Sequence, residues 1–330
     1  MKIVDIDKAV QILKTGNLVV IPTETVYGLA ADGLNEDAVA KIFSEKGRPQ
    51  SNPLILHVSS LEMLEKLVEE INVDQRKLIN KFWPGPLTLL FKKKLIVPKN
   101  VTAGRETVCV RMPKHDKTLE IIKKLGRPLA APSANRSGRP SPTTFKDANF
   151  EMPNIAIVDG GALELGIEST IVDLTDDKFT LLRAGSLDVV EIEKFLNRKI
   201  SFDKNPSALA PGMQFKHYSP EGDLILVWPW ESFGEKVSKE NGSIYSTVEE
   251  AVADSYLNYK TGIVCSADRE KLYFGYETLS IGADFSEQAK YLYSTLFETE
   301  KLGWQKIIVD MTGISNPLLI DRLKKAASKI

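Results

Sequence analysis

The stretch NLVVIPTETVYGLAAD, residues 17–32, indicates what kind of fold the chain adopts. Its first six residues contain the apolar run LVVI and predict a buried strand ending at Pro22. We expect residues 23–32 to form a polar loop rich in small residues. The flanking segments 5–16 and 35–47 show helical patterns that end at glycines. A strand between two helices predicts an α/β domain.

The expected loop carries polar side chains at a place where α/β sheets commonly bind ligands. Thr23, Thr25 and Tyr27 follow the carboxyl end of the strand. A threonine-rich strand end without any ligand explains these residues equally well.

The chain continues to alternate between strands and helices as far as residue 197. Further strands are predicted at 52–58, 86–93, 106–112, 127–132, 154–161, 168–174 and 179–185. Further helices are predicted at 60–71, 74–82, 116–125 and 188–197.

A second, smaller domain is predicted after residue 222. Residues 203–222 contain three prolines and two glycines without any period, which is typical of a linker. Short apolar strands then alternate with helical stretches, which predicts a parallel sheet. These strands are expected at 223–228, 261–267, 276–282 and 306–311, and the longest helix at 284–302. We therefore predict a first domain at 1–204, a linker or lid at 205–222, and a small Rossmann-like α/β domain at 223–330.

The composition is that of an ordinary globular protein whose charge is unevenly distributed. The formal net charge is −1, yet residues 81–127 carry 12 basic and three acidic side chains. Such a segment is typical either of a solvated basic face or of a site for an anionic ligand. Cys109 and Cys265 lie far apart in apolar runs, which favours buried thiols in a reducing compartment. No apolar run approaches the length of a membrane-spanning helix, so we expect a cytoplasmic protein without membrane contact.

Two further segments have the composition of ligand-binding loops. APSANRSGRPSPT, residues 131–143, has no strand or helix period, and its prolines stiffen a loop that offers several hydroxyl groups. EKGRPQSNPL, residues 45–54, places Lys46 and Arg48 around a glycine, and in an extended segment both side chains point the same way. Two cations on one side suit a triphosphate. The first segment could equally be a surface turn that binds no ligand. A lysine at the carboxyl end of a helix interacts favourably with the helix dipole, which would explain Lys46 but not Arg48.

Familiar nucleotide and hydrolase motifs are absent from the sequence. The nearest approach to a P-loop is GALELGIES, residues 161–169, which lacks the lysine. No dinucleotide-binding glycine motif follows a strand, and neither a zinc-ligand pattern nor a nucleophile elbow occurs. The residues alone predict a cationic, hydroxyl-rich pocket for an anionic small molecule or a nucleic acid.

Six segments, taken in order, closely resemble the threonylcarbamoyl-AMP synthase family. They are PTETVYGLAAD (22–32), KGRPQSNPLILHV (46–58), WPGPLTLLF (83–91), VTAGRETVCVRMP (101–113), APSANRSGRPSPT (131–143) and GIESTIVDL (166–174). The segment APGMQFKHYSP, residues 210–220, before a small domain resembles the two-domain form of the family. The resemblance implies a YrdC-like twisted α/β domain with a concave basic cavity.

The implied reaction is an adenylation. L-Threonine, bicarbonate or CO₂, and ATP would give threonylcarbamoyl-AMP and pyrophosphate. The tRNA-threonylcarbamoyl transferase machinery would then use this product to modify an adenosine next to the anticodon. Mg²⁺ is expected to arrive with ATP, because no dedicated metal ligands are visible.

The resemblance also implies roles for individual residues. The catalytic groups would be Lys46, Arg48, Ser133 and Asn135. The nucleotide would contact Arg48, Asn52, Thr107, Ser133, Ser141, Arg183 and Tyr218. Threonine or its carbamate would contact Thr25, His57, Arg111, the Ala131 backbone and Ser169. Without the resemblance, His57 is best explained as a structural histidine in a buried strand.

Two other functions can be compared with this interpretation. The basic segment 81–127 could serve a nucleic-acid-binding protein, and weak RNA binding is a further expectation. A related enzyme that transfers carbamoyl groups would need acylphosphatase and zinc-knuckle segments, and this chain has neither.

Overall fold

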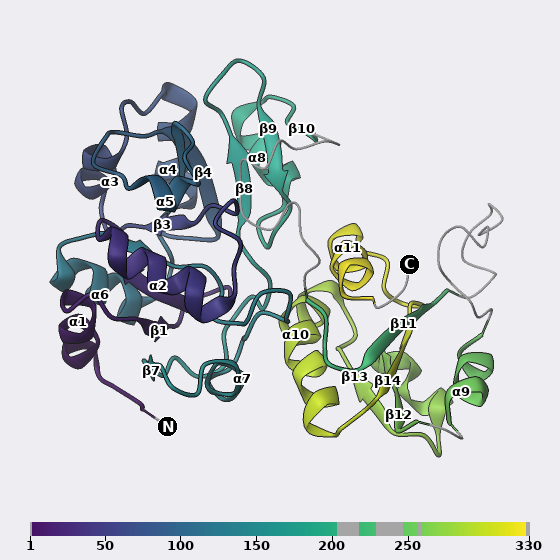
Figure 1. Ribbon diagram of the computed structural model, residues 1–330. Helices are drawn as coiled ribbons and strands as arrows, with labels where there is room; N and C mark the ends of the chain where they lie inside the picture. Colours follow the sequence, from purple (N-terminus) through teal and green to yellow (C-terminus); the bar gives the residue numbers. More distant parts are fainter. Residues whose placement is uncertain (1, 203–217, 229–246, 257–258, 328–330) are drawn as a thin grey trace. The chain divides into compact units, whose positions relative to one another are not determined.

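The computed structural model describes residues 2–202, 218–228, 247–256 and 259–327. These residues fall into two compact units. The first unit contains the described residues up to 137 and those from 141 to 202 (Figure 1). The second unit contains residues 138–140 together with the described residues from 218 onward. Three residues from the middle of the predicted ligand loop thus belong to the second unit.

The first unit is built on a mixed ten-stranded sheet of order β10-β9-β8-β4-β5-β3-β6-β2-β1-β7. Its strands are β1 (Val19–Ile21), β2 (Gly28–Asp32), β3 (Ile55–His57), β4 (Leu87–Lys92), β5 (Thr107–Arg111), β6 (Leu129–Ala130), β7 (Ala156–Ile157), β8 (Thr170–Asp173), β9 (Thr180–Arg183) and β10 (Ser201–Phe202).

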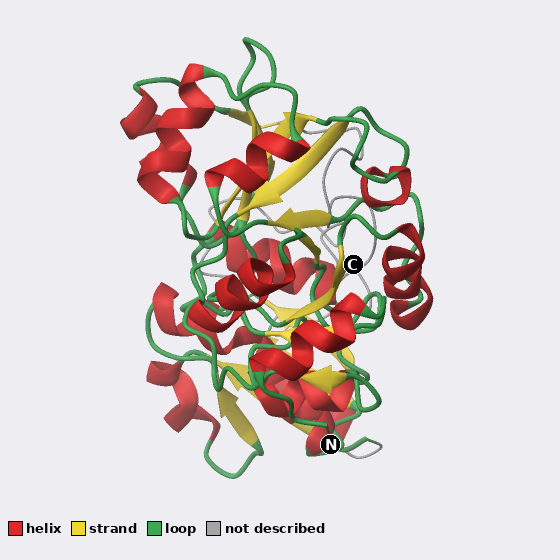
Figure 2. Cartoon of the chain, turned by 90° about the vertical axis from the view of Figure 1, so that its left-hand side faces the viewer, coloured by secondary structure: helices red, strands yellow, loops and turns green. Residues whose placement is uncertain are grey.

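Helices pack beside this sheet, red against yellow strands in Figure 2. They are α1 (Ile6–Lys14), α2 (Glu36–Lys46), α3 (Leu61–Leu67), α4 (Val73–Phe82), α5 (Lys99–Thr102), α6 (Asp116–Leu125), α7 (Phe145–Glu151) and α8 (Val189–Leu196). Local signals set their ends. The Asn35 side chain caps the start of α2, and Gly47, at φ 59°, ends it in the left-handed conformation that glycine tolerates best.

The two faces of the central strands differ because side chains alternate along a strand. One face of β3, β4, β5 and β8 contributes to the main hydrophobic core, with residues such as Leu56, Leu89 and Val110. The other face carries a much smaller apolar cluster, made of Ile55, Leu90, Cys109, Ile171 and Leu182. Polar and cationic side chains share this second face, which we call the polar face of the sheet.

The second unit is a four-stranded, fully parallel sheet of order β11-β14-β12-β13. Its strands are β11 (Asp223–Val227), β12 (Thr261–Cys265), β13 (Thr278–Ser280) and β14 (Lys306–Asp310). Its helices are α9 (Val248–Tyr256), the 3₁₀ helix η3 (Ala267–Tyr273), α10 (Phe285–Lys301) and α11 (Pro317–Ala326). Asp310, at the end of β14, is fully buried and accepts hydrogen bonds from the Tyr273 hydroxyl at 2.6 Å and the Thr312 backbone N–H at 2.9 Å.

Most predicted elements are confirmed within a few residues, including the parallel sheet of the second unit. Two predictions were wrong. Residues 23–32 are not all loop, because 28–32 form β2, which pairs antiparallel with β1. The segment around Lys46 and Arg48 is not extended, because α2 runs through Lys46 and Gly47 turns the chain. Most of the predicted linker, 203–217, lies outside the described residues.

Candidate active site

The polar face of the sheet brings together predicted site residues that are far apart in the sequence. His57 in β3 lies directly beside Arg111 in β5, because the two strands pair in parallel in that register. Thr107, four residues before Arg111 in β5, faces the same side by alternation. Arg183 in β9 pairs with Ile171, a residue of the apolar cluster on this face.

Lys46 joins the two loops that the sequence singled out. Its Nζ donates to the carbonyl of Ser133 at 2.6 Å and also to the carbonyl of Asn135. The Lys46 carbonyl in turn accepts the backbone N–H of Ser137 at 2.8 Å. The lysine is 3% exposed, so it is a buried cation that orders the loop.

Arg48 and Asn52 are joined by hydrogen bonds within the 45–54 segment. The Arg48 guanidinium donates to the Asn52 side-chain oxygen at 2.7 Å and to the Asn52 carbonyl at 3.1 Å. It also donates to the Pro53 carbonyl at 2.7 Å. These bonds hold a planar, charged group in one orientation.

Burial and a neighbouring positive charge lower the proton affinity of two cations of this site. Burial and then the positive charge of Arg48 hold the pKa of Lys46 well below its usual value, although Glu151 opposes this shift. Burial and then Arg183 lower the pKa of Arg48 to about 9. Buried like charges that disfavour each other are stabilised by an anion placed among them. The arrangement is therefore suited to binding an anion.

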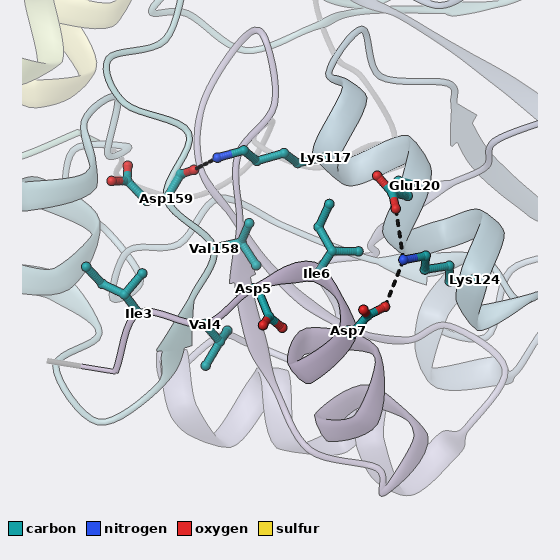
Figure 3. Close-up of a pocket in the computed structure, with 10 residues that line it drawn as sticks. All are labelled: Ile3, Val4, Asp5, Ile6, Asp7, Lys117, Glu120, Lys124, Val158 and Asp159. Atoms are coloured by element: carbon teal, nitrogen blue, oxygen red, sulfur yellow. Dashed lines mark hydrogen bonds and ion pairs between the residues drawn. The ribbon is translucent and has the colours of Figure 1, made fainter.

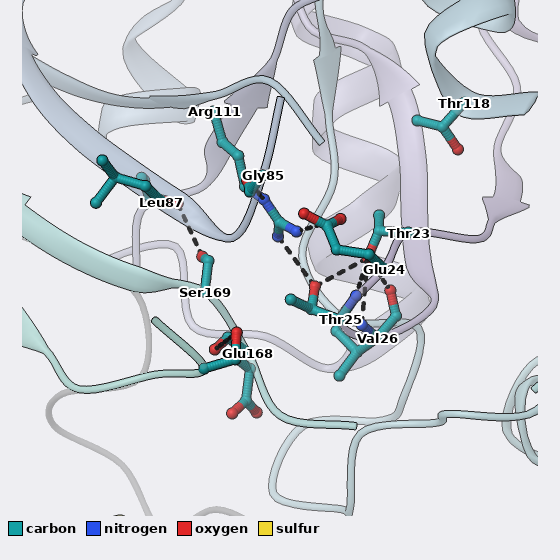
Figure 4. A network of polar contacts seen from close by, with 12 residues as sticks. Thr23, Glu24, Thr25, Val26, Gly85, Leu87, Arg111, Thr118, Glu168 and Ser169 are labelled. Carbon is teal, nitrogen blue, oxygen red and sulfur yellow. Dashed lines mark hydrogen bonds and ion pairs between the residues drawn. The ribbon is translucent and has the colours of Figure 1, made fainter. Parts of the chain in front are cut away.

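Arg111 is the centre of a separate network near the start of β2 (Figure 4). Its Nε donates to the Gly85 carbonyl at 3.1 Å, and its Nη1 donates to the Thr25 hydroxyl at 3.0 Å. Its Nη2 lies 2.6 Å from a carboxylate oxygen of Glu24. Both ionic side chains are less than 5% exposed. Such a held guanidinium can present a rigid fork to a carboxylate.

Ser169 contacts side chains from two neighbouring strands, Thr88 in β4 and Arg183 in β9. Its hydroxyl lies 2.8 Å from that of Thr88, and it accepts a bond from Arg183 at 3.0 Å. The preceding residue, Glu168, is buried and accepts a hydrogen bond from the Ser141 hydroxyl at 3.1 Å. Ser141 is thereby held next to the residue that precedes Ser169.

The remaining predicted residues fall in different places. Ala131 follows β6, and its N–H donates to the Ile55 carbonyl at 3.2 Å, next to the strand that carries His57. Tyr218 lies in the second unit. Its ring stacks on Tyr293 at 5.1 Å between centroids and is 4% exposed, with Arg322 over it. Contact between Tyr218 and a nucleotide stays a prediction.

His57 is expected to remain neutral at every working pH. Burial, with the positive charge of Arg111 as the second cause, lowers its pKa from 6.5 to about 3. A neutral imidazole can accept or donate one hydrogen bond next to an anionic substrate without adding charge.

An NMR titration of the His57 imidazole tests this expectation. We expect no titration between about pH 5 and 8 in the folded protein. Since the folded pKa lies below the unfolded one, the stability that the neutral form contributes is complete above 6.5 and is lost as the pH falls towards 3. A midpoint near 6.5 in the folded protein would contradict the prediction.

Two acidic residues of the site were not predicted from the sequence. Glu24 stands between Thr23 and Thr25, and Glu168 stands next to Ser169. The only available signal was their position inside segments already singled out. An acidic side chain in a loop is usually solvated, so nothing local marked either of them as buried.

Pockets elsewhere on the first unit do not involve the predicted site. One of about 390 Å³ is lined by residues of α1, α6 and the segment after β7, among them Asp5, Lys124 and Asp159 (Figure 3). Its charged groups are already engaged, since Lys124 contacts Asp7 and Glu120, and Lys117 donates to the Asp159 carbonyl.

Family models match nearly the whole chain. Residues 11–185 match the model described as Telomere recombination, and residues 187–328 match the model described as Threonylcarbamoyl-AMP synthase, C-terminal domain. The chain belongs to the threonylcarbamoyl-AMP synthase family. The resemblance noted from the six sequence segments is thereby confirmed, as is the two-domain α/β fold.

Individual relatives agree with the family assignment. The threonylcarbamoyl-AMP synthase of Pyrococcus abyssi is 38% identical over 325 residues, covering 96% of this chain and 92% of that protein. That of Schizosaccharomyces pombe is 33% identical, covering 98% of this chain and 88% of that protein. The crystal structure of P. abyssi Sua5 complexed with L-threonine has a TM-score of 0.85 at 37% identity, covering 98% of this chain and 94% of that one. Members of the threonylcarbamoyl-AMP synthase family are enzymes that transfer a nucleotidyl group, so this chain is an enzyme of that class.

Proposed function

We propose that this member of the family converts L-threonine, bicarbonate or CO₂, and ATP into threonylcarbamoyl-AMP and pyrophosphate. The observation that carries the proposal is the presence in one unit of a chain of neighbouring cations, Lys46, Arg48 and Arg183, and of the Arg111 network. An ATP triphosphate would relieve the repulsion among the cations. An amino-acid carboxylate would match the guanidinium fork of Arg111.

The proposed roles of the residues follow from their contacts. Lys46 would keep the loop of Ser133 and Asn135 in place and, with Arg48, would neutralise the phosphates. Transfer to the α-phosphorus is chiefly a matter of positioning and charge neutralisation, so fixed cations are the groups it needs. The nucleotide would also contact Asn52, Thr107, Ser141, Arg183 and Tyr218. Threonine would lie near Thr25, His57, Arg111, Ala131 and Ser169.

Mg²⁺ would enter the site bound to ATP. Among the described residues no cluster of three or more His, Cys, Asp or Glu side chains could hold a metal ion. A magnesium ion that keeps several waters and is bound mainly by phosphate oxygens needs no such cluster. Its charge would add to that of Lys46 and Arg48 on the leaving pyrophosphate.

We also propose the domain boundaries and the cellular location of the protein. We retain 1–204 as the catalytic domain, 205–222 as the linker or lid, and 223–330 as the small domain. No described helix is long and apolar enough to cross a bilayer. We propose a cytoplasmic enzyme whose product passes to the tRNA-threonylcarbamoyl transferase machinery for modification of tRNA.

Pyrophosphate release tests the proposed function directly. The protein with ATP and Mg²⁺ is expected to release pyrophosphate only when threonine and bicarbonate are both present. Omitting either one should reduce release to background. Release that is indifferent to threonine would contradict the proposal, and salt-sensitive RNA binding unaffected by ATP would favour a nucleic-acid-binding role instead.

A further inference from the structure

The Arg111 network contains buried polar atoms that lack hydrogen bonds. Glu24 is 4% exposed, and its Oε1 and Oε2 have no hydrogen-bond partner among the described residues. Within the same set of residues, Arg111 Nη2 has none either, apart from its ion pair with Glu24. Figure 4 shows the two side chains directed toward each other beside Thr25. Glu24 Oε2 and Arg111 Nη2 therefore have only each other, at 2.6 Å, and Glu24 Oε1 has no partner among the described residues.

Such atoms are costly unless something binds them. A buried carboxylate needs several donors, and a single ion pair supplies only part of what water would give. Backbone bonds do not meet this need, since the N–H of Leu165 donates to the Glu24 carbonyl and not to its side chain. The spot suits a ligand that carries a donor for Glu24 and an acceptor for Arg111 close together.

An α-amino acid in its zwitterionic form has this pair of groups. Its carboxylate can accept from the guanidinium, and its ammonium can donate to the carboxylate, so charges alternate across the site. A ligand with a carboxylate alone would meet Arg111 but would bring a second negative charge next to Glu24. The cluster thus distinguishes an amino acid from a simple carboxylic acid.

We propose that Glu24 binds the α-amino group of L-threonine, while Arg111 binds its carboxylate. The inference rests on the proposed function. It adds Glu24 as a residue that binds the reacting atom of threonine, the α-amino nitrogen. The amino nitrogen is the atom that acquires the carbamoyl carbon, so a site that recognises it admits only substrates able to react. Neighbouring Thr25, held by Arg111, completes the same network.

The experiment compares the binding of L-threonine with that of 2,3-dihydroxybutyrate, in which a hydroxyl replaces the amino group. The full-length protein is titrated with each ligand by calorimetry, with ATP binding measured in parallel. We expect the wild-type protein to prefer threonine by about 10- to 100-fold, the range of one hydrogen bond between charged groups. Glu24→Gln should lose most of this preference while it still binds ATP.

Asp32→Asn is the matched control. Asp32 is also buried and paired with an arginine, Arg127, in the first unit, but it belongs to no predicted ligand set. This variant should keep the wild-type preference. A Glu24→Gln protein that binds ATP and prefers threonine as strongly as the wild type overturns the inference.

A structure of the wild-type protein with L-threonine tests the role of Glu24 without any substitution. An amino nitrogen within about 3.2 Å of a Glu24 carboxylate oxygen supports the inference, and one beyond about 4 Å overturns it. Wild-type protein that binds threonine without any preference over the hydroxy acid overturns the role of Glu24 alone. Wild-type protein that binds no threonine contradicts the proposed function itself.

Discussion

Replacement of Lys46 by methionine is expected to reduce threonine-dependent pyrophosphate release by about 10²- to 10³-fold. The methionine fills the volume of the lysine stem, but it removes the ammonium that donates to the carbonyls of Ser133 and Asn135. Both carbonyls then lose their fixed donor, and the loop loses the cation that orders it. The anion site also loses one of its charges. Initial rates at saturating threonine, with ATP varied, measure the effect.

Lys41→Met provides the control for the Lys46 variant. Lys41 lies on the same helix, α2, and also donates to a carbonyl, that of Gly16 at 2.6 Å, but it is exposed and lies outside the predicted site. Its replacement should leave pyrophosphate release within about twofold of the wild type, because surface substitutions have small effects. A Lys46→Met enzyme that remains folded by circular dichroism and fully active would contradict the proposed role of Lys46.

Arg111→Lys is expected to raise the threonine KM by at least about thirtyfold while the ATP KM changes much less. The lysine keeps a positive charge opposite Glu24, so the buried carboxylate is not left without a counter-ion. It cannot reproduce the planar, five-donor guanidinium, which donates to the Gly85 carbonyl and the Thr25 hydroxyl. Loss of a buried, hydrogen-bonded charge contact costs about 2–5 kcal/mol, which corresponds to thirtyfold or more in affinity. Steady-state kinetics with each substrate varied in turn measure the two KM values.

Arg127→Lys is the matched control for Arg111. Arg127 pairs with the buried carboxylate of Asp32 in the same unit, but its own side chain is half exposed. Its replacement should alter neither KM beyond about twofold. Arg111→Ala should shift the threonine KM in the same direction as Arg111→Lys and also destabilise the fold, because Glu24 then remains buried and unpaired. An unchanged threonine KM in both Arg111 variants would rule out Arg111 as the carboxylate-binding group.

Much of the secondary structure could be predicted because its signals are local. The helix at 116–125 was predicted with the bounds that the structure has, from its apolar period and the glycine after it. The strand β2 was missed because Gly28 and two alanines have weak strand propensity. That strand forms because β1 and β6 lie on either side of it and supply its hydrogen bonds.

The composition of the site could also be predicted in part, but not the partners of its residues. The resemblance to the family supplied Lys46, Ser133 and Asn135 as a group. It did not indicate that the ammonium of Lys46 bonds the carbonyls of the other two, across 87 and 89 residues of chain. Likewise, Glu24 looked like an ordinary loop carboxylate. It became a candidate ligand group only when the structure showed it buried against Arg111.

The amino-acid sequence is sufficient to establish the two α/β units, the order of most of their elements and membership of the family. Those properties depend on short-range patterns of apolar residues, turns and motifs, each of which can be recognised within a few tens of residues. The register that sets His57 beside Arg111, the burial of Glu24 and the clustering of the cations follow only from the folded sheet. These features arise from pairings between distant strands, and electrostatic interactions depend on distance in space and not on distance along the chain.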